Sequence, residues 1–577
     1  MAKRTGIAHV VTTTRTYKDR VYRTHLLRRS YREDGVVKNE TLGNLSHLPD
    51  ALVDIIRRSL QGETFVPLNE AFEIVSSRAQ GHVAAVATAM ERLGLAELVA
   101  AKPCRERNLI LALVAARIVA PQTKLSTTRW WRTTTLAEDF GVSSANENDL
   151  YAAMDWLLPR QRRIEKKLAA RHLKTGGRVL YDLSSSYFEG TTCPLARRGY
   201  NRDGKHGLLQ VNYGLLTDHR GCPVAVSVHE GHTSDSTTFL PEVQRLRNEF
   251  GIERLVMVGD RGMISQKAID TMQGNAGLDW ITALKSVSIR ALVEQGHLQL
   301  DLFDERNLFE FSAPEYPGER LVACRNVALA KLRAHKREDL LCATEKNLGK
   351  IKARVEAGKL VGQDAIGMRV GQVIHQYKMA KHFELTIAPG SFSFQRKTDG
   401  IAAEAALDGV YIIRTSVSAE QMSEADCVRN YKSLSNVERA FRSFKTMDLK
   451  VRPIHHRLAD RVRSPIFLCM LAYYVEWHMR EAWRELMFAD PDQEAKAFRD
   501  PVAPATRSQA ALTKIARHTL EDTTPVHSFA TLMADLASIV RNTCRSPRAD
   551  NAPSFELLTT ASSKQRHALQ LLRQISA

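Results

Sequence analysis

Hydrophobic and polar positions follow different periods along the chain, and each period predicts a different kind of structure. Residues 1–48 contain stretches rich in Val, Thr and Tyr, such as HVVTTTRTY and RVYRTHLL. The sequence Glu-Asp-Gly at 33–35 is typical of a turn and predicts a hairpin. From Pro49 the apolar residues recur three and four apart, as in DALVDIIRRSL and RNLILALVAARIVA, which is typical of amphipathic helices. We therefore predict a β-rich arm over residues 1–48 and a helical region over residues 49–172.

Short apolar runs replace the helical period from Arg178 onward. They predict three strands, a helix, a strand, a helix and a strand, with a DHRG turn between the second and third strands. Three meandering strands followed by alternating units are the outline of a ribonuclease H-like α/β domain. In such a sheet the first and fourth strands are neighbours.

A strongly charged helical stretch interrupts this rhythm and is followed by strand-like pieces at KHFELTI and SFSFQR. We interpret residues 286–405 as an insertion domain, made of a solvated helical hairpin plus strands. The core pattern resumes at LDGVYIIRTS and continues with a helix from about Ala425. The predicted fold class is therefore α/β, with a core of residues 173–285 and 406–485 and a mainly helical C-terminal region over residues 486–577.

The excess of basic residues indicates that the protein binds a polyanionic partner. The chain has 82 Lys and Arg against 64 Asp and Glu, a net charge of +18. Residues 1–38 hold ten basic and three acidic residues, so the β-rich arm is basic. Nucleic acid is the leading candidate, and residues 49–172 are the expected DNA-end-binding region, although charge alone would equally suit a ribosome-associated or anionic-membrane protein.

The distribution of cysteines and apolar residues predicts a cytoplasmic protein. Eight Cys occur singly, without a C-x-x-C pair, and the first residues lack the apolar stretch of a signal peptide. The longest apolar run, residues 465–475, is too short to span a bilayer. It predicts a buried helix, and we expect no membrane association.

Two aspartates are predicted to converge at neighbouring strands. Asp182 lies in the first strand, RVLYDLSSSYF, and Asp260 closes the fourth, RLVMVGD. Like charges this close are costly unless a cation lies between them. Magnesium fits best, because it prefers oxygen ligands with open water positions and serves phosphoryl chemistry.

A third carboxylate comes from a predicted helix over residues 428–447. At about 100° per residue, an inward apolar stripe forms from Leu434, Val437, Phe441 and Phe444. The adjoining polar arc consists of Tyr431, Glu438, Arg442 and Lys445. Glu438 can complete the metal site, while the two cations bind phosphates and the phenol stacks on, or hydrogen-bonds to, a DNA strand.

These residues carry a resemblance to a known family. The segment Y-x2-L-x3-E-x6-K from Tyr431 to Lys445 is similar to the Tyr-Arg-Glu-Lys signature of bacterial insertion-sequence transposases of the DDE type. The phrases YDLSSSYFEG, VMVGDRGM, DGVYIIRTS and RPIHHRLADRVRSPIFLCMLAYYVEWHM resemble that group as well. The resemblance covers residues 175–480, with a weaker echo in the basic arm.

The resemblance implies a DNA transposase with a ribonuclease H-like core interrupted by an insertion. Asp182, Asp260 and Glu438 would be catalytic and would hold two Mg²⁺ ions, with Mn²⁺ able to substitute. Such an enzyme binds the terminal inverted repeats of an insertion sequence, cleaves DNA by hydrolysis and joins the 3′-hydroxyl ends to target DNA. It would work as a homodimer in a synaptic complex, associated with the bacterial nucleoid.

One position departs from the signature, because Leu434 stands where the family has Arg. Leu434 belongs to the inward stripe, so the phosphate contact must pass to Arg439 or Arg442. Residues 428–463 hold ten basic and three acidic residues, which favours a phosphate-facing surface. The predicted DNA-binding residues are Tyr431, Arg439, Arg442, Lys445, Arg261, His456 and Arg457.

Other residues compete for chemical roles. Asp218 lies in a turn and Asp235 is expected to cap the following helix with Ser236, whereas Asp203 and Glu189 stay open as rival acids. The remaining groups lack the spacing that their chemistry needs: His455 and His456 have no second ligand pair for zinc, and residues 184–186 lack the G-x-S-x-G elbow of a serine nucleophile.

Three functions therefore stay open at the level of sequence. The first is a catalytically intact transposase. The second is a ribonuclease H-like nuclease that cuts without strand transfer, and the third is a non-catalytic, domesticated DNA-binding derivative. The complete triad argues against the third.

Overall fold

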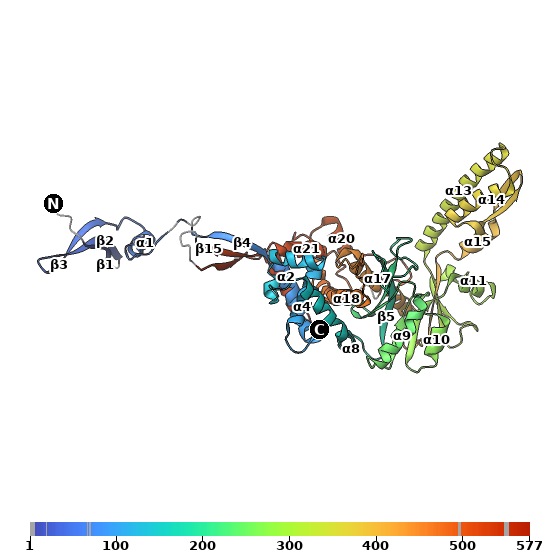
Figure 1. Ribbon diagram of the computed structural model, residues 1–577, viewed down its shortest axis with the longest axis horizontal. Helices are drawn as coiled ribbons and strands as arrows, with labels where there is room; N and C mark the ends of the chain where they lie inside the picture. Colours follow the sequence, from blue (N-terminus) through green and yellow to red (C-terminus); the bar gives the residue numbers. More distant parts are fainter. Residues whose placement is uncertain are drawn as a thin grey trace. The chain divides into compact units, whose positions relative to one another are not determined.

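The computed structural model describes residues 6–18, 20–65, 67, 71–493, 498–546 and 553–576 (Figure 1). The chain divides into two compact units, each described by itself. The first contains Met1–Ser77 and Arg541–Leu558, and the second contains Arg78–Val540 and Thr559–Ala577.

The first unit is built on two small sheets. Its described residues form an antiparallel sheet in the order β1–β2–β3, followed by α1 (Asp50–Leu60), and most of a second sheet in the order β16–β15–β4. The strands are β1 (Ile7–Tyr17), β2 (Arg20–Glu33), β3 (Val36–Asn44), β4 (Glu73–Ala79), β15 (Val540–Arg545) and β16 (Phe555–Leu558). Asp34 and Gly35 join β2 to β3 with φ of 52° and 80°, as a tight hairpin turn requires. The hairpin predicted at residues 33–35 is confirmed.

Helices pack around α18 (Ala459–Ala482) in the second unit. This helix is buried along most of its length, because its apolar residues face α2, α4 and α7 as well as the strand β7. The buried helix predicted from residues 465–475 is confirmed. The helices before the main sheet are α2 (Gly81–Arg92), α3 (Leu95–Val99), α4 (Arg105–Val119), α5 (Lys124–Trp130), α6 (Leu136–Asp139), α7 (Glu147–Leu157) and α8 (Gln161–His172). Near the end of the chain lie α20 (Gln509–Arg517), α21 (Phe529–Ala537) and α22 (Ser563–Arg573).

No described helix is by itself long and apolar enough to cross a membrane. Two consecutive segments, Arg105–Val119 and Lys124–Thr133, pass that test only when taken together, and they are bent by 88° where they join.

A large mixed sheet forms the centre of the second unit. The described residues give it eight strands in the order β10–β11–β14–β9–β8–β5–β6–β7. The strands first reached along the chain are β5 (Gly177–Tyr187), β6 (Gln210–Asp218), β7 (Pro223–Glu230), β8 (Leu255–Val258) and β9 (Leu278–Ala283), with the helices α9 (Asp235–Asn248) and α10 (Gln266–Gln273) between them. β5, β6 and β7 are antiparallel neighbours, whereas β5, β8 and β9 are parallel. The predicted element order and the adjacency of the first and fourth strands are confirmed.

The sheet extends into the segment that the sequence assigned to an insertion. The extension consists of β10 (Leu308–Phe311), β11 (Arg320–Arg325) and β14 (Val410–Thr415), preceded by α11 (Ser286–Glu294) and α12 (Leu302–Glu305). β10 and β11 lie within residues 286–405, so part of that segment belongs to the sheet. A short buried run such as that of β11 has no period that separates a sheet strand from a strand of a separate module.

The rest of the segment forms a module with its own apolar core, which includes Leu341, Leu348 and Ile366. Its elements are α13 (Val327–Glu356), α14 (Gln363–Tyr377), β12 (Phe383–Ala388), β13 (Ser391–Arg396) and α15 (Thr398–Ala406). α13 and α14 pack together, and β12 pairs with β13 (Figure 1). The predicted hairpin and strands are present, but the charged stretch forms one 30-residue helix, α13, rather than both arms of the hairpin.

Deleting residues 327–408 is expected to leave the sheet folded. Arg325 pairs with Val410 at the ends of β11 and β14, and Asn326 N donates to Gly409 O at 2.9 Å. The deletion therefore joins Asn326 to Gly409, and Asn-Gly is a preferred two-residue hairpin loop. The thermal midpoint, followed by circular dichroism, should stay within about 4 °C of the full-length value, a change on the order of 1 kcal/mol.

A deletion one residue longer is the matched control for this loop. Removing residues 327–409 leaves Asn326 alone between the paired strands, which is too short for a hairpin. This variant should melt earlier or aggregate. Equal behaviour of the two deletions would contradict the register of β11 and β14.

Candidate active site

Asp182 and Asp260 lie at the same level on neighbouring parallel strands. The register of β5 and β8 pairs Leu180 with Val258, and each aspartate follows two residues later. Asp260 begins the turn after β8, where its carbonyl oxygen accepts hydrogen bonds from Met263 N and Ile264 N. Asp182 therefore lies inside β5, level with Asp260 just past the end of the neighbouring strand β8.

Glu438 lies on a helix that packs against β5. The single helix predicted over residues 428–447 is wrong, because α16 (Glu424–Lys432) ends at Ser433, α17 (Leu434–Arg442) starts there, and η5 (Ser443–Met447) is a π-helical turn. Ser433 Oγ donates to Asn430 O at 2.5 Å, a local hydrogen bond of the kind that competes with helix continuation.

The inward stripe of this segment nevertheless faces the core. Val437, Phe441 and Phe444 are buried, and Leu434 is half-buried against the same core. Glu438 is exposed on the other side of α17. The packing role predicted for Leu434 is confirmed.

Tyr431 is tied to one of the aspartates. Its hydroxyl donates to Asp260 Oδ1 at 3.2 Å. Burial raises the pKa of Tyr431 well above its ordinary value, and Asp260 raises it further. The phenol therefore keeps its proton and can act as a lasting hydrogen-bond donor to this carboxylate.

The electrostatic environment of Asp182 disfavours a bare negative charge. Burial raises the pKa of Asp182 to about 7. A hydrogen bond from Leu183 N at 2.8 Å and the Arg202 guanidinium oppose that rise, whereas the charges of Asp260 and Glu438 add to it. Both other predicted carboxylates therefore act on Asp182, and a cation beside it would relieve the cost of burial and repulsion.

The donor set fits a hard divalent ion, because three carboxylates offer oxygen ligands. The oxygen atoms of the three carboxylates do not all lie within 4.8 Å of one another. Within the described ranges, only His172, Cys222 and His478 bring three potential ligand atoms that close together. Glu438 is exposed on α17, and its charge acts on Asp182.

Asp203 anchors the segment that follows α17, a role that the sequence did not indicate. Its side chain is 2% exposed and forms ion pairs with Lys445 at 2.9 Å and with Arg452 at 2.7 Å. Asp203 Oδ2 also accepts a hydrogen bond from Tyr187 N at the end of β5. Lys445, predicted to bind DNA, is thus mostly buried and paired with Asp203.

The other predicted DNA-binding residues fall into two groups. Four are exposed arginines, namely Arg261, Arg439, Arg442 and Arg457. His456 is half-buried, with its ring edge-on to Tyr151 at 5.9 Å. Burial lowers the pKa of His456 to about 4, helped by Lys124, so this ring is uncharged at neutral pH. It offers a phosphate no full positive charge.

The rival acids have structural partners. Asp218 Oδ1 accepts hydrogen bonds from Arg220 N and Cys222 N, each at 2.9 Å, which confirms its role in the turn. Asp235 is the first residue of α9 and pairs with Arg202, while Ser234 occupies the N-cap position, so the cap predicted from Asp235 and Ser236 is wrong by one residue. Glu189 lies 3.7 Å from His455.

Comparisons with known proteins identify the family of the chain. Residues 179–475 match the family model described as transposase DDE domain, and residues 10–66 match the N-terminal domain of IS1634 family transposases. A solved structure described as "Cryo-EM structure of piggyBac transposase synaptic complex with hairpin DNA (SNHP)" is similar with a TM-score of 0.34 and 9% identity, over 78% of this chain and 76% of that chain. No curated protein matches. Because the first match spans more than half of the sequence, the chain belongs to the DDE transposases of bacterial insertion sequences.

Proposed function

We propose that this DNA transposase is catalytically intact and that Asp182, Asp260 and Glu438 form its active site on a ribonuclease H-like core. The observation that carries the proposal is that Asp182 in β5 and Asp260, two residues beyond the end of β8, lie at the same level of the paired strands. The order β7–β6–β5–β8–β9, antiparallel on one side of β5 and parallel on the other, supports the assignment of the core.

The carboxylates would hold divalent metal ions, which transposases of this family generally use. Mg²⁺ is the expected ion and Mn²⁺ a substitute, because both suit oxygen ligands. Ions held by Asp182, Asp260 and Glu438 would supply activation of water or a 3′-hydroxyl and stabilisation of the leaving oxygen. Tyr431 would keep Asp260 oriented through its hydroxyl, and the exposed Arg439 and Arg442 on α17 would bind flanking phosphates.

The proposed partners are the terminal inverted repeats of the element and target DNA. The net charge of +18 and the basic arm over residues 1–48 support a polyanionic partner, with residues 49–172 as the end-binding region. Pairing of both DNA ends within a homodimer, next to the bacterial nucleoid, belongs to the same proposal. Residues 286–405 and 486–577 would flank the core as an insertion and a C-terminal region.

A strand-transfer assay tests the function. The full chain is incubated with Mg²⁺, a plasmid target and a duplex that carries the terminal repeat found beside the gene, either uncut or with its 3′ end already freed. We expect cleavage of the first duplex and joining of the second. Cleavage without joining would indicate a nuclease, and binding without either reaction would indicate a non-catalytic DNA-binding derivative.

Metal affinity is expected to rise with pH up to about 7 and then level off. Burial raises the pKa of Asp182 to about 7, against an ordinary value of 3.8, so below that pH an incoming ion must displace a proton. The expected slope is about tenfold per pH unit for one displaced proton. The opposing Arg202 and the neighbouring Asp260 and Glu438 are the charges that set this balance.

Calorimetric titration with Mn²⁺ in buffers of different ionisation enthalpy measures the released proton directly. Asp182→Asn is the matched control, because it keeps the shape of the side chain but has no proton to lose in this range. Equal proton release by the variant and the wild type would contradict the assignment of Asp182.

A further inference from the structure

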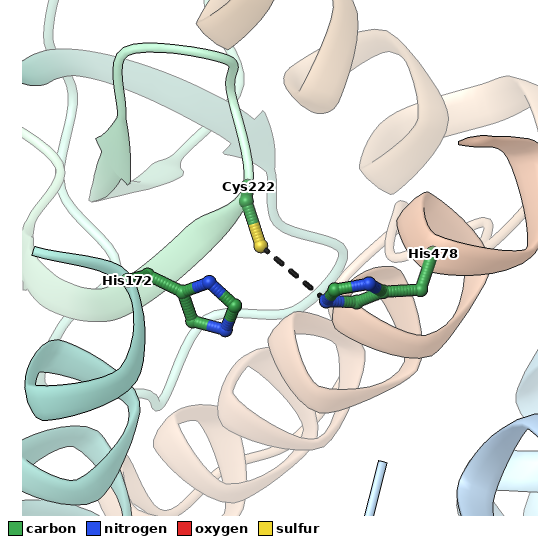
Figure 2. Close-up of side chains that lie close together, drawn as sticks. All are labelled: His172, Cys222 and His478. Carbon is green, nitrogen blue, oxygen red and sulfur yellow. Dashed lines mark hydrogen bonds between the residues drawn. The ribbon is translucent and has the colours of Figure 1, made fainter. Parts of the chain in front are cut away.

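Three side chains with metal-binding atoms meet outside the carboxylate site. They are His172 at the end of α8, Cys222 in the turn between β6 and β7, and His478 on α18 (Figure 2). One potential ligand atom of each lies within 4.8 Å of the other two, and Cys222 Sγ lies 3.8 Å from His478 Nε2. Cys222 and His478 are buried, while His172 is half-buried.

We propose that His172, Cys222 and His478 bind a transition-metal ion, and that zinc is the ion that this ligand set fits best. Nitrogen and sulfur donors suit zinc, whereas the oxygen-seeking Mg²⁺ of the catalytic proposal has no ligand here. Tetrahedral zinc, with Zn–S of about 2.3 Å and Zn–N of about 2.0–2.1 Å, separates its ligand atoms by roughly 3.3–3.6 Å. The observed spacing needs only a small closure to reach that range.

The ligand types suit a metal. Imidazole binds an ion through an unprotonated ring nitrogen and cysteine binds it as a thiolate, so an ion bound here would displace the Cys222 proton. Asp218, Arg171 and Arg220 are among the charged groups that act on the cluster, and Glu481 acts on Cys222.

Neighbouring side chains fix the ring orientations. The Tyr474 hydroxyl lies 3.0 Å from His172 Nε2, which leaves His172 Nδ1 for an ion, in the manner of the outer hydrogen bonds around metal ligands. The Trp477 ring lies edge-on to His478, with centroids 4.9 Å apart. His172, Asp218 and Arg220 also line a cavity of about 1280 Å³, so the cluster borders a cavity on its His172 side.

An ion at this point would join segments that are far apart in the sequence. Cys222 and His478 are 256 residues apart, and the three ligands belong to the helical region, the sheet and the buried helix α18. The proposed role is therefore structural, and it does not depend on the catalytic assignment of the carboxylates.

Metal analysis of the full-length protein tests the proposal. The chain is purified without chelators from zinc-supplemented cells, and its zinc is measured by mass spectrometry. We expect about one zinc ion per chain, lost in Cys222→Ser and in His478→Gln. Two controls should keep the ion: Cys193→Ser, which removes a buried thiol elsewhere, and Asp182→Asn, which removes a proposed catalytic ligand.

Cobalt substitution of the wild type tests whether a cysteine binds the ion, and it does so even if a variant fails to fold. A sulfur-to-cobalt charge-transfer band, with the strong visible bands of a tetrahedral ion, is the expected spectrum. The proposal is overturned if the wild type and Cys222→Ser contain the same amount of zinc. It is also overturned if Asp182→Asn alone loses zinc, or if the cobalt-substituted wild type lacks the sulfur-to-cobalt band.

Discussion

Glu438→Gln is expected to abolish DNA cleavage while leaving binding of the element ends within a few-fold of the wild type. The amide keeps the size of the side chain but lacks the charge that a divalent ion needs, and Glu438 is exposed, so the fold is not at stake. Losing one member of a catalytic unit costs on the order of 10⁴-fold in rate. Cleavage is measured on a labelled terminal-repeat duplex and binding by gel mobility shift.

The control for this substitution is Glu420→Gln, which removes another exposed carboxylate between β14 and α16. It should cleave at the wild-type rate, since this glutamate is not part of the proposed site. Retained cutting by Glu438→Gln would refute the triad, whereas equal loss in both variants would indicate a general effect of charge.

Asp203→Asn is expected to destabilise the protein and to slow cleavage. The substitution leaves Lys445 and Arg452, with side chains only 12% and 26% exposed, facing a neutral amide. Breaking a buried ion pair costs about 3–5 kcal/mol, and the partial exposure of Arg452 favours the lower end. Because η5 directly follows the helix of Glu438, a shift of about 1 Å there is expected to slow cleavage by roughly 10²-fold.

Urea unfolding and the cleavage assay together measure these two effects. Asp460→Asn is the comparison, because Asp460 pairs with Arg463 at 2.8 Å while 69% of its side chain is exposed. An exposed pair contributes at most about 1 kcal/mol, so this variant should resemble the wild type. Wild-type stability of Asp203→Asn would show that Asp203 does not anchor η5.

The hydrophobic pattern predicted the central strands well because each has a clear boundary. β5 to β9 are short apolar runs separated by turns or amphipathic helices, and their order followed from the sequence alone. For the same reason Asp182 could be placed in one strand and Asp260 at the end of the neighbouring strand. The hairpin of the β-rich arm could also be predicted, because Asp34 and Gly35 readily adopt the positive φ that its turn requires.

Contacts between segments far apart in the chain could not be predicted from the hydrophobic pattern. A helical wheel assumes one continuous axis, so it could not detect the break at Ser433 between α16 and α17. Strand membership of β10 and β11 depends on pairing with β14, which lies beyond the module between them. No local period reports such a pairing.

Side chains that are far apart in the sequence and meet only in the folded protein form no recognisable sequence motif. Asp203 lies in the loop between β5 and β6, and its partners Lys445 and Arg452 are more than 200 residues away in the sequence. His172, Cys222 and His478 likewise lack the close spacing that identifies most zinc sites from sequence. Only the three-dimensional contacts reveal either cluster.

The long interval between Asp260 and Glu438 also determines when each residue of the proposed triad is synthesised on the ribosome. β5 and β8 can pair as soon as residue 260 has emerged, but Glu438 follows 178 residues later. At about 5–20 residues per second this delay is roughly 10–35 seconds. A nascent chain therefore already carries its basic arm while its proposed acidic triad is still missing one member, so newly made protein can attract DNA before it is able to cut.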